Sequence, residues 1–121
     1  MSYVLIVEDD ADVRDMLQTL LRAHGYTTAV AVNGREALMA AEERPPCLIL
    51  LDLMMPVMTG WEFRERQLAE SSIAAVPVVC LSAVYDHRMV TERLKVPCLS
   101  KPVDFDQLLA CVSTHCSRGM H

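Results

Sequence analysis

Short apolar runs alternate along this chain with longer amphipathic stretches, and four of the runs lead directly into polar residues. The runs cover residues 3–7, 47–51, 76–81 and 96–100, and they precede Glu8-Asp9-Asp10, Asp52, Ser82 and Lys101-Pro102, respectively. Alternation of strand-like and helix-like segments indicates an α/β fold, with a parallel sheet covered by helices on both faces. Ligands of such open sheets bind at the carboxyl ends of the strands. The polar residues after the four runs are therefore expected to converge on one site.

The same pattern predicts five strands and five helices in a single domain of residues 1–121, a length typical of one domain. The second strand is expected at 27–32. The helices are expected at about residues 12–24, from 33 until Pro45-Pro46, at 59–70, between 85 and 95, and from 104 onward. Their capping signals are Gly25, Asn33 with Glu36, Thr59 with Glu62, and Asp104.

Charge and hydropathy exclude several classes of partner. Acidic residues outnumber basic ones by 16 to 11, which gives a formal net charge of −5. No basic cluster reaches the density of a nucleic-acid contact surface, so direct binding of nucleic acid is not expected. The chain begins without a charged leader and holds no apolar stretch of about 18 residues, so neither a signal peptide nor a membrane span is expected. These features predict a cytoplasmic protein.

Five cysteines are present, and no two of them form a C-x-x-C pair. Cys47, Cys80 and Cys98 lie inside apolar strand-like runs, whereas Cys111 and Cys116 lie near the end of the chain. We interpret the cysteines as buried free thiols, with a metal site or a redox pair as the alternatives. Exposure and reactivity are a second option for Cys111 and Cys116.

Carboxylates gather after two of the apolar runs. Glu8, Asp9 and Asp10 are consecutive, so at least two of them can face the edge of the sheet together with Asp52. Packed carboxylates repel one another unless a cation neutralises them. Because the candidate ligands are all oxygen, with no histidine or cysteine at suitable spacing, the pattern favours Mg²⁺ over zinc.

An aspartate beside a bound metal ion can attack phosphorus and form an aspartyl-phosphate. Lys101 would supply a compact positive charge for the product, and Ser82 would supply a hydroxyl donor. Each group alone also has a common structural role. These roles are an acidic helix N-terminus for Glu8-Asp9-Asp10, a helix cap for Ser82 and a surface position for Lys101. Their occurrence together at the ends of four predicted strands favours the shared site.

The chain resembles the receiver domains of two-component response regulators over nearly its whole length. Val4–Asp10 is similar to the family's first strand and acid pair, Leu51–Gly60 to its phosphoacceptor loop, and Leu99–Pro102 to its lysine turn. The resemblance implies a flavodoxin-like doubly wound sheet of five strands in the order 2-1-3-4-5. It also implies a cis peptide bond between Lys101 and Pro102.

The resemblance further implies a role for each site residue. Asp52 would accept a phosphoryl group from the phosphohistidine of a histidine kinase. Mg²⁺ would be bound directly by Asp9, Asp52 and the Met54 carbonyl, and through water by Glu8. The phosphoryl oxygens would be held by Ser82, Lys101 and the backbone N–H of Ala83. The implied chemistry is self-catalysed phosphoryl transfer and autodephosphorylation in a module that is otherwise not an enzyme. Its partners would be a sensor histidine kinase or phosphotransfer protein and a downstream protein.

Some positions that tune the family's response carry unusual residues here. Met54 and Val84 occupy the two positions that adjust dephosphorylation, and neither can orient an attacking water. Slow or moderate autodephosphorylation is therefore expected. Cys98 stands where the family usually has its switch aromatic, and residues 93–97 lack the usual Gly-Ala-Asp/Asn stretch. The route from phosphorylation to a partner is therefore expected to differ from the usual one.

Two other functions stay open on the sequence alone. Asp10-Ala11-Asp12 matches the nucleophile pattern of haloacid-dehalogenase-like phosphatases, although that assignment leaves Asp52 without a role. The other is a receiver that acts as a phosphorylation-independent scaffold, although no key acid, hydroxyl or lysine is missing. We expect a stand-alone signalling module, with a receiver cut from a larger regulator or a hybrid kinase as the alternative.

Overall fold

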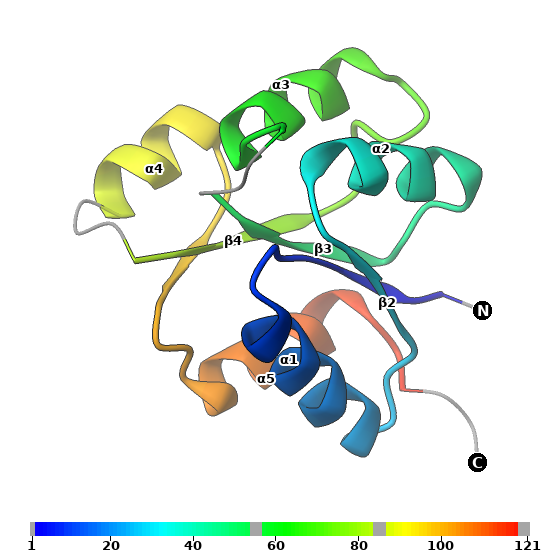
Figure 1. The fold of residues 1–121 in the computed structure, drawn as a ribbon, viewed down its shortest axis with the longest axis vertical. Helices are drawn as coiled ribbons and strands as arrows, with labels where there is room; N and C mark the ends of the chain where they lie inside the picture. Colours follow the sequence, from blue (N-terminus) through cyan, green and yellow to red (C-terminus); the bar gives the residue numbers. More distant parts are fainter. Residues whose placement is uncertain (1, 54–56, 84–86, 119–121) are drawn as a thin grey trace.

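Five parallel strands form one sheet in the order β2-β1-β3-β4-β5, in a computed structural model that describes residues 2–53, 57–83 and 87–118. The strands are β1 Val4–Val7, β2 Thr28–Ala31, β3 Leu48–Asp52, β4 Val78–Ser82 and β5 Cys98–Ser100. The helices are α1 Ala11–Ala23, α2 Gly34–Glu43, α3 Gly60–Ala69, α4 His87–Leu94 and α5 Phe105–His115. Helices α1 and α5 lie on one face of the sheet, and α2, α3 and α4 lie on the other (Figure 1). The predicted flavodoxin-like architecture is confirmed.

The core lies on both faces of the sheet. Every residue of β1, β3 and β4 is buried, as expected for strands covered by helices on both sides. Because successive side chains of a strand point to opposite faces, Leu5 packs in one cluster with Phe63 of α3, while Ile6 packs in another with Leu17 of α1. None of the described helices combines the length and the apolar composition needed to cross a membrane.

Short polar side chains cap the N-termini of α1, α2, α3 and α5, and those of α2, α3 and α5 were predicted. Asp10 caps α1 and Asp104 caps α5, and Thr59 forms a complete capping box with Glu62 at the start of α3. Asn33 caps α2 and accepts a hydrogen bond from the Glu36 amide. The Glu36 carboxylate, however, accepts from the amide of Val32, so the predicted box at α2 is not reciprocal.

One glycine and two prolines explain where other elements stop and start. Gly25 follows α1 with a φ of 89°, in the left-handed region that favours glycine, which agrees with its predicted role as a cap. Strands β4 and β5 begin two residues later than predicted, directly after Pro77 and Pro97. Proline cannot donate a ladder hydrogen bond, although the carbonyls of Pro77 and Pro97 accept from the Ile49 and Cys80 amides.

The carboxyl ends of two central strands extend further than predicted. Asp52 and Ser82 were placed by the sequence pattern just after their strands, whereas they are the last residues of β3 and β4. Asp52 lies in register with Leu81, and Ser82 lies in register with Ser100. The sheet itself therefore fixes the backbone of both candidate site residues.

The cysteine prediction is wrong for one pair. Cys47, just before β3, and Cys116, the C-terminal cap of α5, form a disulfide across a sequence separation of 69, with a Cα–Cα distance of 5.5 Å. The fold brings the start of a central strand and the end of the last helix together, which sequence spacing alone does not reveal. Cys80, Cys98 and Cys111 are free thiols, of which Cys80 is buried. Burial, with a contribution from Cys98, raises the pKa of the Cys80 thiol to about 12.

Candidate functional site

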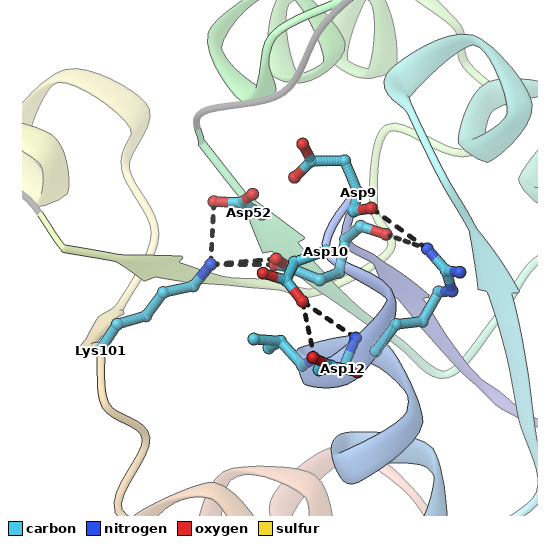
Figure 2. A network of polar contacts seen from close by, with 8 residues as sticks. Asp9, Asp10, Asp12, Asp52 and Lys101 are labelled. Atoms are coloured by element: carbon cyan, nitrogen blue, oxygen red, sulfur yellow. Dashed lines mark hydrogen bonds and ion pairs between the residues drawn. The ribbon is translucent and has the colours of Figure 1, made fainter.

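Four of the predicted site residues meet at the carboxyl edge of the sheet. Glu8 follows β1, Asp52 ends β3, Ser82 ends β4 and Lys101 follows β5. Glu8, Asp52 and Ser82 are buried, whereas the Lys101 side chain is 22% exposed. Figure 2 shows Lys101 reaching toward Asp52 and toward the acidic segment after β1. The expected convergence of strand ends is therefore present.

Lys101 connects two buried carboxylates. Its Nζ lies 3.0 Å from Glu8 Oε2 and 3.3 Å from Asp52 Oδ1. Its backbone amide donates to the carbonyl of Ser82 at 3.0 Å, and its bond to Pro102 is cis, as the family resemblance implied. Burial alone would lower the pKa of the Lys101 ammonium, but the hydrogen bond to Glu8 and the charges of Asp52 and Glu8 outweigh it and raise the pKa.

Three carboxylates form a compact group of possible metal ligands. Each of Glu8, Asp9 and Asp52 offers one carboxylate oxygen, and these three oxygens lie within 4.8 Å of one another. With Lys101 beside them, these three acids and one base carry two net negative charges, which a divalent cation would balance. Oxygen donors of this kind suit Mg²⁺. The charge balance and the donor atoms therefore both fit the predicted ion.

Asp10 does not take part in this group. Its Oδ1 accepts hydrogen bonds from the amides of Asp12 at 2.9 Å and Val13 at 3.2 Å, at the N-terminus of α1 (Figure 2). Of the three consecutive acids, Glu8 and Asp9 thus face Asp52, which agrees with the expectation of at least two. The capping role also occupies one oxygen of the carboxylate that a phosphatase of the Asp-x-Asp type would use as its nucleophile.

A glycine lets helix α3 approach the end of strand β3 closely. The amide of Gly60 donates to the carbonyl of Leu53 at 3.0 Å. A Cβ atom on Gly60 would lie 2.7 Å from the backbone oxygen of Asp52, closer than Cβ contacts allow. Sequence analysis recognised Gly60 only as part of a motif, and the contact explains why a side chain is excluded there.

The structure also adds one residue that the sequence analysis missed. Arg14, on the first turns of α1, donates from Nη1 to the backbone carbonyls of Glu8 at 3.1 Å and Asp9 at 3.4 Å. The sequence signal was an arginine four positions after the helix cap Asp10, which by itself reads as a surface residue.

Ala83 is exposed directly after β4. Met54 and Val84 lie outside the described residues.

Comparison with protein families and curated relatives points to the family that the sequence resembles. A family model described as the response regulator receiver domain matches residues 4–113. The DNA-binding response regulator MtrA of Mycobacterium leprae (strain TN) is 43% identical over 83 residues, which are 69% of this chain and 36% of that protein. An uncharacterized 14.6 kDa protein of Leptolyngbya boryana is 33% identical over 116 residues, which are 93% of this chain and 88% of that protein.

Solved structures share the complete fold. The chemotaxis protein CheY4 of Vibrio cholerae superposes with a TM-score of 0.85 at 29% identity, covering 96% of this chain and 99% of that one. The signal receiver domain of a signal transduction histidine kinase from Syntrophus aciditrophicus gives a TM-score of 0.83 at 29% identity, covering 94% and 89%. The similarity therefore extends across nearly all of this chain and includes the strand ends that form the site.

Proposed function

This chain belongs to the family of response regulator receiver domains, and we propose that Asp52 is its phosphorylated residue. Receiver domains are signalling modules rather than classical enzymes, phosphorylation at an aspartate is their typical role, and they generally use Mg²⁺ at an acidic pocket. The observation that carries the proposal is the position of Lys101, whose ammonium contacts both Glu8 and Asp52. A lysine placed in this way can stabilise added negative charge on Asp52.

The proposed metal site uses the residues of the carboxylate group. Asp9 and Asp52 would hold Mg²⁺ directly, and the family resemblance implies the carbonyl of Met54, which lies outside the described residues, as a further ligand. Glu8 acts through water, because its carboxylate is buried and already paired with Lys101. When bound, the ion would supply positive charge that balances the carboxylates and the incoming phosphoryl group.

The proposed reaction is a phosphoryl transfer from a phosphohistidine. A carboxylate oxygen of Asp52 attacks phosphorus, the new O–P bond forms as the histidine N–P bond breaks, and the leaving imidazole takes up a proton. Lys101 holds its charge 3.3 Å from Asp52 Oδ1, and the Ser82 hydroxyl and Ala83 amide donate to the transferred group. The chain catalyses this transfer to itself, and water later hydrolyses the acyl phosphate.

The proposed partners follow from this chemistry. The phosphoryl donor is a sensor histidine kinase or a phosphotransfer protein, and a downstream protein reads the phosphorylated form. Direct nucleic-acid binding is not part of the proposal, since the chain is acidic and spans only 36% of the length of the MtrA relative. We assign residues 1–121 to one receiver domain, of which the family model covers 4–113.

Acetyl phosphate with and without Mg²⁺ tests the proposal. The wild type is expected to gain the mass of one phosphoryl group in the presence of Mg²⁺ and to gain none when the ion is removed with a chelator. The Asp52→Asn variant, which keeps the size of the side chain but removes the nucleophilic oxygen, is expected to gain none in either condition. The matched control is Asp15→Asn, which changes an exposed aspartate on the outer part of α1 and should leave phosphorylation unchanged.

Two outcomes would favour the other functions. A phosphoryl group mapped to Asp10 or Asp12 would support a phosphatase-like mechanism and overturn the assignment of Asp52. A wild-type protein that gains no phosphoryl group, yet is folded and binds its partner, would support a phosphorylation-independent scaffold.

A further inference from the structure

We propose that Arg14 is a positioning residue, which orients the carboxylates of Glu8 and Asp9 toward the metal by holding the backbone of the β1–α1 loop. The proposal rests on the function inferred above, because it concerns the same Mg²⁺ site. It adds a residue that touches neither the proposed ion nor the phosphoryl group. Within the described residues its guanidinium donates to two main-chain oxygens, Glu8 O at 3.1 Å and Asp9 O at 3.4 Å.

The loop before α1 is held from two directions. On one side, the Asp10 carboxylate accepts from the amides of Asp12 and Val13, which fixes where the helix begins. On the other side, the Arg14 side chain extends back toward the loop, and its guanidinium donates to the backbone carbonyls of Glu8 and Asp9. Both hydrogen bonds come from the same nitrogen, Nη1, whose two N–H groups lie in the rigid plane of the guanidinium.

The two acids depend on this backbone support to different extents. The Glu8 side chain is buried and held by Lys101, so a second contact already fixes it. The Asp9 side chain is exposed, and within the described residues its carboxylate has no hydrogen-bond partner. The direction of that carboxylate is therefore set chiefly by the backbone, of which Arg14 holds one carbonyl directly. Removal of a residue that orients a metal ligand commonly lowers the affinity of the site for the metal.

The charge of Arg14 and its hydrogen bonds would act on Mg²⁺ in opposite directions. A positive charge near the site repels a divalent cation, so removing the charge alone would tighten Mg²⁺ binding. The hydrogen bonds keep the ligands in place, so removing them would weaken binding. Substitutions of Arg14 can therefore distinguish a positioning role from a purely electrostatic one.

Calorimetric titration with Mg²⁺ tests the inference on three variants. Arg14→Gln removes the charge and the guanidinium donors, whereas Arg14→Lys keeps a positive charge but replaces the fixed N–H groups of Nη1 with a rotating ammonium. A positioning role predicts that both variants bind Mg²⁺ about tenfold more weakly than the wild type. Arg22→Gln is the matched control, because Arg22 lies on the same helix, donates to Thr28 and is far from the acidic loop in the sequence. Its Mg²⁺ affinity should equal that of the wild type.

Each alternative result has a distinct meaning. Unchanged affinity in Arg14→Lys together with tighter binding in Arg14→Gln would show a charge effect alone and overturn the inference. Equal affinity in both variants and the wild type would also overturn it. A wild type that binds no Mg²⁺ would instead contradict the proposed function. The increase in Tm caused by Mg²⁺ gives a second readout for any variant of reduced stability, and a positioning role predicts a smaller increase in both Arg14 variants.

Discussion

Lys101 contacts two buried carboxylates, Glu8 and Asp52, so its protonation is linked to the stability of the fold. Removing the ammonium would leave two buried negative charges with less compensation. The interaction also places a cation where the phosphoryl group is proposed to form. At the scale of single residues, the same ion pairs therefore support the structure and prepare the site.

The first prediction follows from the raised pKa of Lys101. Burial opposes the ammonium, but the hydrogen bond to Glu8 and the charges of Asp52 and Glu8 raise its pKa above the ordinary value. A lysine in the unfolded chain has a pKa of about 10.4. The stability that the Lys101 ion pairs contribute is therefore complete below that pH and is lost as the pH rises through the higher pKa of Lys101 in the folded protein. Urea unfolding from about pH 8 to about pH 11.5 should show a steeper decline for the wild type than for Lys101→Met. Parallel declines in the two proteins would contradict the linkage.

The second prediction concerns the contact of Gly60 with the backbone of Asp52. Gly60→Ala would place its Cβ 2.7 Å from the Asp52 backbone oxygen, so β3 or α3 must move. We expect a loss of about 1–3 kcal/mol in the free energy of unfolding and slower phosphorylation by acetyl phosphate.

A matched glycine substitution provides the control for this clash. In Gly34→Ala the Cβ would meet the Met58 side chain, 2.8 Å from its Cγ, and that flexible chain can turn away. Urea unfolding should give a smaller loss for Gly34→Ala, and its phosphorylation rate should match the wild type. Equal losses of stability and rate in both variants would contradict the proposed role of the Gly60 contact.

Helices and strands with strong periodic patterns were predictable from the sequence. The exact residues at which strands end, and the contacts between distant parts of the chain, were less predictable. The apolar runs identify all five strands, and short polar caps such as Thr59 and Asp104 locate helix starts because they act within one turn. Asp52 and Ser82 lie within their strands instead, because pairing with neighbouring strands extends them. Such pairing depends on residues distant in the sequence, which local patterns do not contain.

The third prediction concerns the disulfide between the start of β3 and the end of α5. Closing a loop with a sequence separation of 69 restricts the unfolded chain. The chain-entropy account gives a stabilisation of about 4 kcal/mol for a loop of this size. Urea unfolding of the double variant Cys47→Ser, Cys116→Ser should therefore show a loss of up to about that amount. A reducing agent should have a similar effect on the wild type.

Two controls separate the bridge from other effects of cysteine replacement. Cys111→Ser, which removes a free thiol on the same helix as the bridge, should change stability much less. The bridge lies at the amino end of β3 and Asp52 lies at the carboxyl end, so the double variant should still be phosphorylated. If reduction leaves the unfolding of the wild type unchanged, the bridge does not contribute to stability.

Across the whole molecule, α3 and α4 connect the site to the surface. Helix α3 begins at Gly60, shortly after Asp52, and α4 begins at His87, shortly after Ser82. The two helices also contact each other: the Arg93 guanidinium lies 4.7 Å from the centroid of the Trp61 ring, and Arg64 donates to the Leu94 carbonyl at 3.2 Å. We expect a displacement at either strand end to reach this helix pair.

The fourth prediction uses Trp61 as a reporter of that displacement. Trp61 is the only tryptophan, so its emission can be assigned without ambiguity. Phosphorylation by acetyl phosphate with Mg²⁺ should change its fluorescence in the wild type and leave it unchanged in Asp52→Asn. Arg93→Gln, which removes the cation from the ring, should reduce the change. Identical changes in the wild type and Asp52→Asn would show that the signal reports Mg²⁺ or the reagent instead.

The residues that meet at the candidate site were predictable because parallel strands all end at the same edge of the sheet. Glu8, Asp52, Ser82 and Lys101 were each identified from the residues that follow an apolar run, and the sheet places them together. The support provided by Arg14 was not predictable, because it depends on a side chain folding back onto carbonyls of the preceding loop. Patterns of residue type identify reactive groups better than they identify the contacts that orient them.

Direct identification of the modified residue tests the central claim, that Asp52 is the phosphoacceptor. The protein would be phosphorylated with a phosphoramidate donor and Mg²⁺, since the donor has the N–P bond of phosphohistidine. Borohydride would then reduce the acyl phosphate to homoserine, and mass spectrometry would locate the reduced residue in the peptides. The account predicts homoserine at position 52 alone. Homoserine at the position of Asp9, Asp10 or Asp12, or at none, would contradict it.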